Sequence, residues 1–573
     1  MKYLPTIGLI LLTIFISIFP CNPAFSSRKP IFSDFFESSP EEILKEMTLE
    51  EKIGQILMFG FWGKKLDKDY QYWLRSGKLG NIKIFLRNVE SREQLQELTE
   101  NINLLTSSSK HGIPPFIATD MEGGTVNHIR YDGIHLAPSA GLIGATGNIE
   151  YCRESSRLIA ITLFNLGINM NFAPSADVLT SPMNRVVATR SYSSDPEVVF
   201  KMNRAFIEEH RKLGIVTTVK HYPGHGMSSF DSHIAVGNVD IKLDKLIETH
   251  LYPYVRLISE DKLDGVMVSH IIYTSIDPFY PAAFSKYIIT DLLRSYLGFD
   301  GVIVTDDLEM EGAEGFAESI AGAFQLAFNA GNDLLLVAHT KKKQMELLEK
   351  AKHLFENGLL STEELDRKVL RIIKLKKKYL GTYYSIKNND PDYNYAYSKA
   401  VKKTEEAARN GITMISKKFD MKLPDFFKYF RKNKLKGIIL SPSDSFTFHL
   451  KRFLPDWDVI DIGYYPNKME NYRRIFDSYE KLQKCDLAIL GLANERQVNW
   501  ADFLQKINIP FGIICIDRPH YALLFQKDAL FIVASYSPLG PETEALYKCI
   551  FITGDFKGRI PYHFDKQRLE AFF

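Results

Sequence analysis

Cysteine is scarce in this chain: five occur among 573 residues, and no two form a Cys-x-x-Cys pair. That spacing is typical of zinc sites and thiol redox centres, so we expect neither, and no metal site. Three of the four cysteines beyond the N-terminal segment lie in apolar runs. We expect all four to be buried free thiols, with one disulfide left open as the alternative: Cys152, Cys485, Cys515 and Cys549.

The chain also lacks an excess of either charge, with 71 Lys and Arg against 69 Asp and Glu. This balance gives no support for a nucleic-acid partner. The lysine runs 341–343 and 376–378 are expected to be solvated helix faces. No internal repeat or low-complexity tract is found. The hydrophobic content of 45% is that of a globular protein, and 573 residues exceed one ordinary core, which predicts two domains.

Long apolar runs are missing except at the N-terminus, where residues 7–19 follow Lys2. The run is short for a membrane helix and predicts a signal peptide over 1–26, so we expect no transmembrane helix in the mature chain. Cys21 is a candidate for a lipid anchor, although the residues before it fit a lipoprotein cleavage site poorly. Cleavage near Ser26 is the alternative. Either reading predicts export, to the periplasm, the outside or the cell envelope.

Eight short apolar runs alternate with helical stretches after a capping box formed by Thr48 and Glu51. Five-residue apolar strands imply burial on both faces, as in a parallel sheet. The alternation predicts an α/β fold, a (β/α)8 TIM-like barrel over 27–385. The expected strands are 56–61, 82–86, 115–119, 168–173, 216–219, 265–269, 301–305 and 334–338.

A polar stretch then predicts a linker over 386–410. Beyond it, the apolar runs 437–440, 487–492, 511–516 and 530–534 predict strands that alternate with helices. We therefore expect a smaller C-terminal α/β sandwich domain over 411–573.

Polar residues stand at the ends of several expected barrel strands: Asp120, Asp177, Lys220, His221, His270, Asp306 and His339. The carboxyl ends of barrel strands meet at one rim, which is where such folds carry their chemistry. The densest group runs Lys220-His221-Tyr222-Pro223-Gly224-His225-Gly226, followed by Asp231-Ser232-His233. A second group runs Thr305-Asp306-Asp307-Leu308-Glu309-Met310.

These two groups resemble the signatures of glycoside hydrolase family 3, in its bacterial β-N-acetylglucosaminidase branch. The resemblance runs from about Thr48 to Leu375, with a weaker echo in the C-terminal third, such as Gly558-Arg559-Ile560-Pro561. It implies a retaining exo-β-N-acetylglucosaminidase acting on peptidoglycan fragments or chitin-type oligosaccharides. Such an enzyme takes a small carbohydrate substrate and no cofactor.

The resemblance also implies roles for particular residues. Asp306 would be the nucleophile and His233 the acid and base, with Asp231 orienting the imidazole. An imidazole suits this role because its ordinary pKa lies near neutral pH. Glu309 and Glu122 are the alternative acids. Asp307, next to the nucleophile, would point elsewhere.

Substrate binding is expected from residues matching the branch: Asp120, His128, Arg190, Lys220 and His221. His128 is a departure, because the branch usually reads Gly-Gly-Arg-Val-Gln-Arg and has arginine there. Arg130 is the candidate to compensate. The exact sugar preference is therefore open.

Three other functions remain open from the sequence. His221, His225, Asp231 and His233 could be metal ligands, although such ligands usually come from several strands rather than one loop. The chain could cleave a β-glucoside or β-xyloside, but those family members lack the Asp-x-His group. A non-catalytic sugar-binding protein would have no use for both Asp306 and His233.

Overall fold

The computed structural model describes residues 31–229, 237–389 and 392–564. The predicted signal peptide with Cys21 lies outside these ranges, and so do Asp231 and His233. None of the described helices is long and apolar enough to cross a bilayer. Cys152, Cys485, Cys515 and Cys549 are free and buried, as expected.

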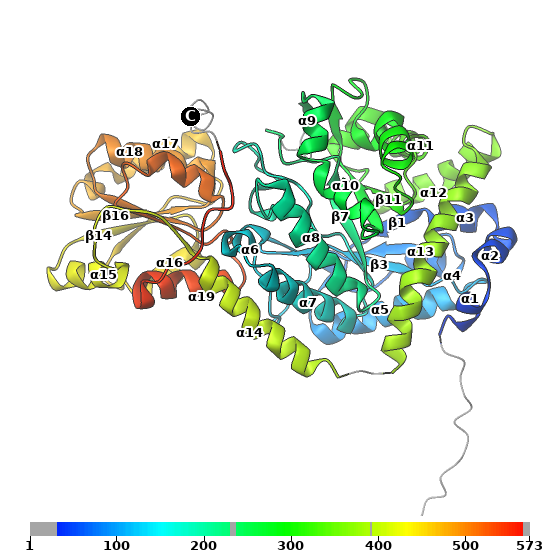
Figure 1. The fold of residues 1–573 in the computed structure, drawn as a ribbon, viewed down its shortest axis with the longest axis horizontal. Helices are drawn as coiled ribbons and strands as arrows, with labels where there is room; N and C mark the ends of the chain where they lie inside the picture. Colours follow the sequence, from blue (N-terminus) through cyan, green and yellow to red (C-terminus); the bar gives the residue numbers. More distant parts are fainter. Residues whose placement is uncertain (1–30, 230–236, 390–391, 565–573) are drawn as a thin grey trace, which may run out of the picture.

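The larger domain is an eight-stranded parallel barrel (Figure 1). Its strands follow the order β11-β9-β7-β6-β3-β2-β1-β12, and a parallel bridge between Val304 and Leu334 joins the two ends. Every strand overlaps a predicted run, so the barrel prediction is confirmed. The strands are β1 (Leu57–Gly60), β2 (Asn81–Lys83), β3 (Phe116–Thr119), β6 (Met170–Asn171), β7 (Val216–Tyr222), β9 (Gly265–Val268), β11 (Val302–Thr305) and β12 (Leu335–Val337).

Helices surround the barrel, beginning with α3 (Leu49–Gln55), whose N-cap Thr48 forms the predicted capping box with Glu51. A short hairpin of β4 (Met121–Gly123) and β5 (Val126–Asn127) lies beside the rim. The main covering helices are α4 (Lys68–Arg75), α5 (Arg92–Ser107), α7 (Ile149–Asn165), α8 (Pro196–Arg211), α10 (Tyr252–Ser259), α11 (Ile320–Ala330), α12 (Lys341–Glu356) and α13 (Thr362–Asn388).

The expectation for the second lysine run is wrong for its first member. Lys376 lies on α13 and is fully buried. Its Nζ donates to Gln55 Oε1 at 2.8 Å and to the Gly80 carbonyl at 3.2 Å. Successive helix residues point about 100° apart, so three in a row cannot all face solvent on a packed helix.

The range predicted as a linker, 386–410, is largely helical. α13 continues to Asn388, and α14 (Asn394–Gly411) fills most of the remaining range. Charged residues of α14, such as Lys402, Glu405 and Arg409, form its exposed side. Its opposite side buries Ala400, Ala407 and Ala408. A polar stretch can therefore be one face of an amphipathic helix.

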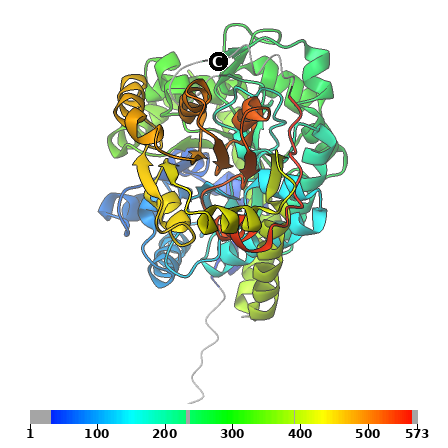
Figure 2. The same cartoon turned by 90° about the vertical axis from the view of Figure 1, so that its left-hand side faces the viewer.

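The C-terminal domain is a six-stranded sheet with helices on both faces (Figures 1 and 2). Its strand order is β13-β18-β17-β16-β14-β15, and β13 alone runs antiparallel to its neighbour. The four predicted strands are present, while the partly exposed edge strands β13 and β15 were not predicted. The strands are β13 (Thr413–Lys417), β14 (Gly437–Ser441), β15 (Asp458–Asp461), β16 (Leu487–Leu492), β17 (Phe511–Cys515) and β18 (Phe531–Ala534).

Helices α17 (Lys468–Leu482) and α18 (Val498–Lys506) lie on one face of this sheet, and α15 (Leu423–Lys432), α16 (Asp444–Lys451) and α19 (Pro541–Lys548) lie on the other (Figure 1). The sheet interior is apolar, as the continuous runs predicted. The predicted α/β sandwich is therefore confirmed.

Candidate active site

Those predicted polar residues that the structure describes lie at the carboxyl end of the barrel. Asp120 links β3 to β4, Lys220 and His221 end β7, and Asp306 follows β11. The peptide bond between Lys220 and His221 is cis. The parallel strands place these side chains on one rim.

The Asp120 carboxylate is surrounded by cationic and imidazole groups. Lys220 Nζ donates to its Oδ1 at 2.5 Å, and Lys83, from β2, donates to its Oδ2. His128 Nδ1 lies 3.4 Å from Oδ2. Burial alone would raise the pKa of Asp120, but the two lysines outweigh it and hold that pKa well below its usual range. Asp120 is thus a fixed, ionised acceptor.

Lys83 was not predicted as a site residue. It lies between Ile82 and Ile84 and is buried at 1% exposure. Burial lowers its pKa to about 8, although the neighbouring Asp120 carboxylate opposes that shift. The signal in the sequence was a charged residue inside an apolar strand, which rarely occurs without a partner.

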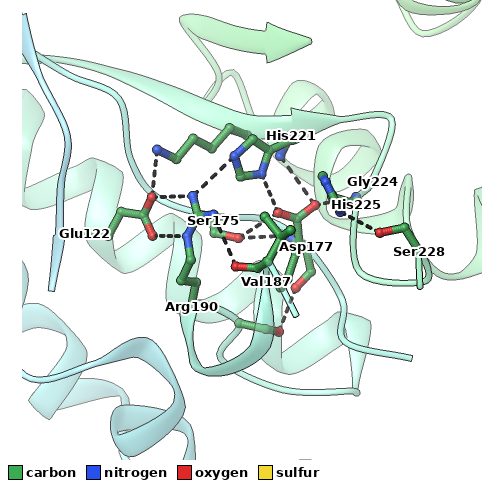
Figure 3. A network of polar contacts seen from close by, with 12 residues as sticks. Glu122, Ser175, Asp177, Val187, Arg190, His221, Gly224, His225 and Ser228 are labelled. Atoms are coloured by element: carbon green, nitrogen blue, oxygen red, sulfur yellow. Dashed lines mark hydrogen bonds and ion pairs between the residues drawn. The ribbon is translucent and has the colours of Figure 1, made fainter. Parts of the chain in front are cut away.

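Glu122 and Arg190 form a two-pronged ion pair (Figure 3). Arg190 Nε donates to Glu122 Oε2 at 2.9 Å, and Arg190 Nη2 donates to Oε1 at 2.7 Å. Lys220 Nζ lies 2.7 Å from the same Oε1. Burial favours a higher pKa for Glu122, but Arg190 and Lys220 lower it to about 2. Arg190 and Lys220 therefore favour the ionised form of Glu122, whereas a proton donor needs the protonated form.

His221 is oriented by a residue from the neighbouring strand end. Asp177 Oδ2 accepts from His221 Nδ1 at 2.7 Å, and Arg190 Nη2 lies 3.2 Å from His221 Nε2 (Figure 3). Asp177 was noticed as a polar strand end but not predicted as a site residue. Its pairing with His221 is a contact between two strands that sequence spacing does not reveal.

The loop after β7 is held at its start. His225 donates its backbone N–H to Asp177 Oδ1 at 2.6 Å, and its Nδ1 lies 2.8 Å from Ser228 Oγ. A Cβ added to Gly226 would lie 1.9 Å from the Val178 carbonyl oxygen, so only glycine fits. These contacts fix residues 225–228, the part of the loop that precedes Asp231 and His233 in the chain.

Asp306 and Asp307 point to different surroundings, as predicted. Asp306 is partly exposed at the rim and donates its backbone N–H to the Val268 carbonyl at 3.1 Å. Asp307 is buried, accepts from the Ala338 N–H at 3.1 Å, and lies 3.1 Å from His339 Nε2. Asp307 therefore joins β11 to β12 and leaves Asp306 as the rim carboxylate.

Glu309, the other alternative acid, bonds to the backbone that follows β12. Its Oε2 accepts from the N–H groups of His339 and Thr340, the latter at 3.1 Å. Its side chain is 4% exposed. Glu309 thus binds the backbone N–H groups just before α12.

Two further observations concern Arg130 and metal ligands. The described ion pairs of Asp120 are with Lys83, His128 and Lys220 rather than Arg130, and a contact of Arg130 with the sugar stays a prediction. Among the described residues, no group of three or more His, Cys, Asp or Glu side chains could hold a metal ion.

Known proteins support the resemblance. The model of the glycosyl hydrolase family 3 N-terminal domain matches residues 48–375. A β-hexosaminidase of Tolumonas auensis is 34% identical over 299 residues, which cover 51% of this chain and 85% of that protein. β-Hexosaminidase A of Pseudoalteromonas piscicida is 34% identical over 322 residues, 52% of this chain and about half, 53%, of that protein.

A solved structure extends the similarity to both domains. It is the family 3 β-N-acetylglucosaminidase from Paenibacillus sp. str. FPU-7, with a TM-score of 0.78 and 25% identity over 90% of this chain and 99% of that chain. The barrel, the C-terminal domain and the segment matched by the family model all indicate the same family. The chain belongs to glycosyl hydrolase family 3, as a glycoside hydrolase homologous to the β-hexosaminidases.

Proposed function

We propose that the protein is a retaining exo-β-N-acetylglucosaminidase that removes terminal β-linked N-acetylglucosamine. The observation that supports this most strongly is the ionised Asp120 carboxylate, held by Lys83 and Lys220 on the same rim as Asp306. A fixed acceptor beside cationic donors suits the hydroxyl groups of a single sugar.

In the proposed reaction, the Asp306 carboxylate attacks the anomeric carbon, and the bond to the leaving oxygen breaks. His233 gives a proton to that oxygen, and a covalent glycosyl-enzyme remains. His233 then takes a proton from water, whose oxygen attacks the anomeric carbon and releases Asp306. Asp231 would hold the imidazole in one tautomer and stabilise its cation.

The proposed substrate is the end of a peptidoglycan fragment or chitin-type oligosaccharide. The Glu122, Arg190 and His221 side chains are at most 14% exposed. Buried polar groups suit the enclosed end of a sugar chain better than the middle of a polymer. This supports the exo mode of action.

A β-glycosidase of another specificity is the second candidate, because His128 stands where the branch has arginine. Chromogenic β-glycosides separate the two candidates when N-acetylglucosaminide, glucoside and xyloside are assayed side by side. Our proposal requires the N-acetylglucosaminide to exceed the glucoside at least about a hundredfold in kcat/KM, because a polar pocket rejects an analogue that leaves its groups unpaired. Comparable rates would favour the second candidate.

Stereochemistry tests the covalent route independently. A β-glycoside should release the β-anomer first, as seen by proton NMR in the first minutes. An α-anomer as first product would mean direct attack by water and would remove Asp306 from the role of nucleophile.

We also propose that the protein is exported, with Cys21 as a candidate lipid anchor. The support is the N-terminal apolar run after Lys2. Labelling cells with a fatty-acid analogue, with Cys21→Ser as the matched control, tests the anchor. Label absent from both proteins would argue for simple cleavage near Ser26, and label retained by Cys21→Ser would place the lipid on another residue.

A further inference from the structure

The turn that carries Arg190 is held from the C-terminal domain. The one-turn helix η2 (Ala188–Arg190) begins with Ala188 at φ 39°, a left-handed conformation that alanine rarely adopts. Thr189 Oγ1 donates to Asp517 Oδ1 at 3.0 Å, and both side chains are buried. The Tyr562 hydroxyl donates to the Ser191 carbonyl at 3.0 Å. Such a conformation persists where its surroundings impose it.

The segment that carries Glu122 has its own contact with that domain. Glu542 Oε1, at the start of α19, accepts from the Ser139 N–H at 3.0 Å. The residues just before Ser139 pack on the glycines that follow Glu122. A Cβ at Gly123 would lie 2.3 Å from the Pro138 carbonyl oxygen, and the Gly124 N–H donates to the Ala137 carbonyl at 3.0 Å.

Both partners of one ion pair are thus held by residues more than 300 positions further along the chain. Figure 1 shows the last described segment, in red, between the C-terminal sheet and α6 (Ala140–Thr146). Tyr562 and Glu542 are both buried at that boundary. A two-pronged ion pair loses strength when its two carriers shift, because both hydrogen bonds depend on distance and angle.

We propose that Asp517, Tyr562 and Glu542 form a C-terminal brace of positioning residues, which holds Arg190 against Glu122 and so sets sugar affinity. This inference rests on the proposed function, because that function places Arg190 in the sugar site. The brace acts on the sugar site through the ion pair of Arg190 with Glu122. It gives the C-terminal domain a role in a site whose groups all come from the barrel.

Steady-state kinetics of the full chain on the chromogenic N-acetylglucosaminide test the brace. Asp517→Ala and Tyr562→Phe should each raise KM about tenfold and change kcat less than about threefold, since lost substrate positioning acts mainly on binding. Asp517→Asn keeps an oxygen acceptor for Thr189 and should restore KM. In a double-mutant cycle, Thr189→Val should add little to Asp517→Ala, because both remove the same bond.

Tyr536→Phe is the matched control. The Tyr536 hydroxyl is also buried, but its bond of 2.8 Å goes to Thr413 Oγ1 within the C-terminal domain. Removing it should leave KM unchanged. An equal rise in KM in Tyr536→Phe would show a general loosening of the domain and overturn the brace.

Hydrogen exchange of the Arg190 and Ser191 amides gives a readout that needs no turnover. These amides donate to the Val187 and Ala188 carbonyls within the turn. They should exchange at least about tenfold faster in Asp517→Ala and Tyr562→Phe than in the parent chain or Tyr536→Phe, because they report local opening.

The two readouts separate the brace from the proposed function. A parent chain that cleaves no N-acetylglucosaminide would reject the function, while faster exchange in the variants would still support the brace. Unchanged exchange with unchanged KM would overturn the brace and leave the function standing. A variant that does not fold is replaced by Thr189→Val, which tests the same bond from the barrel side.

Discussion

Asp177 and His221 form a buried pair, with His221 Nδ1 2.7 Å from Asp177 Oδ2. Burial alone would raise the pKa of Asp177, but the imidazole of His221 and the N–H of His225 hold it well below its usual range. The ionised Asp177 carboxylate therefore accepts a hydrogen bond from the Nδ1–H of His221. His221 then presents Nε2 as the acceptor toward Arg190.

Asp177→Asn should disturb this arrangement without removing volume. The amide can present its N–H groups to His221 and favour the other tautomer, so kcat/KM should fall about tenfold to a hundredfold, as is usual for a residue that orients another. Steady-state rates on the N-acetylglucosaminide measure the effect. The exposed Asp555, paired with Lys422, gives the control Asp555→Asn, which should match the parent. An unchanged rate in Asp177→Asn would contradict the orienting role.

Asp306→Asn should abolish turnover and leave the fold intact. Loss of the nucleophile removes the covalent route, so kcat should drop by several decades, more than about a thousandfold. Circular dichroism and thermal unfolding check the fold, and the chromogenic assay checks the rate. A variant that retains more than about a tenth of the parent rate would exclude Asp306 as the nucleophile.

His233→Ala should affect substrates according to their leaving groups. Poor leaving groups need a proton, whereas activated aryloxides do not, so sugar-linked substrates should lose far more rate than aryl glycosides. Asp231→Ala should show a milder version, because it orients rather than transfers. Assays on a paired aryl glycoside and oligosaccharide decide the matter. An equal loss on both would make His233 a binding or structural residue.

The barrel could be predicted because each strand is a short apolar run buried on both faces, a pattern typical of parallel sheets covered by helices. The edge strands β13 and β15 expose part of their residues, so no continuous run marks them. Lys376 shows what composition cannot predict, because a run of three lysines does not indicate which of them faces the interior.

Some residues of the candidate site could likewise be predicted from the sequence, and others could not. Asp120, Lys220 and Asp306 could be predicted because polar residues stand out at strand ends. The pairing of Asp177 with His221 depends on two strand ends 44 residues apart, and the contact of Asp517 with Thr189 on residues 328 apart. Local sequence patterns do not reveal contacts between residues so far apart in the chain.

His128→Arg should strengthen sugar binding. Burial, together with the Lys83 and Lys220 charges, lowers the pKa of His128 to about 4, although the Asp120 carboxylate opposes that shift. His128 is therefore neutral at pH 7, and the pocket lacks the charge that arginine would supply. We expect KM for the N-acetylglucosaminide to fall about threefold to tenfold, since one charged hydrogen bond contributes about 1 kcal/mol or more. His128→Gln, neutral as well, is the control and should not lower KM.

Glu542 should make the stability of the protein depend on pH. Its carboxyl is fully buried, and burial raises its pKa to about 8, although the Ser139 N–H opposes that shift. The folded chain therefore binds more protons at this group than the unfolded chain between about pH 4.5 and 8. The free energy of unfolding contributed by Glu542 is fully present below pH 4.5 and is lost as the pH rises toward 8.

Glu542→Gln should remove this dependence, because glutamine keeps the oxygen that accepts from Ser139 and carries no charge. Urea unfolding of parent and variant at pH 5, 6.5 and 8 measures it. The free energy of unfolding of the variant, relative to that of the parent, should rise by at least about 1 kcal/mol from pH 5 to pH 8, since one unit of pKa shift corresponds to about 1.4 kcal/mol. The exposed Glu544, on the same helix, gives the control Glu544→Gln, which should show no such gain. If the stability of Glu542→Gln relative to the parent falls with rising pH, or rises equally in Glu544→Gln, then Glu542 is not the neutral buried acid at the domain boundary.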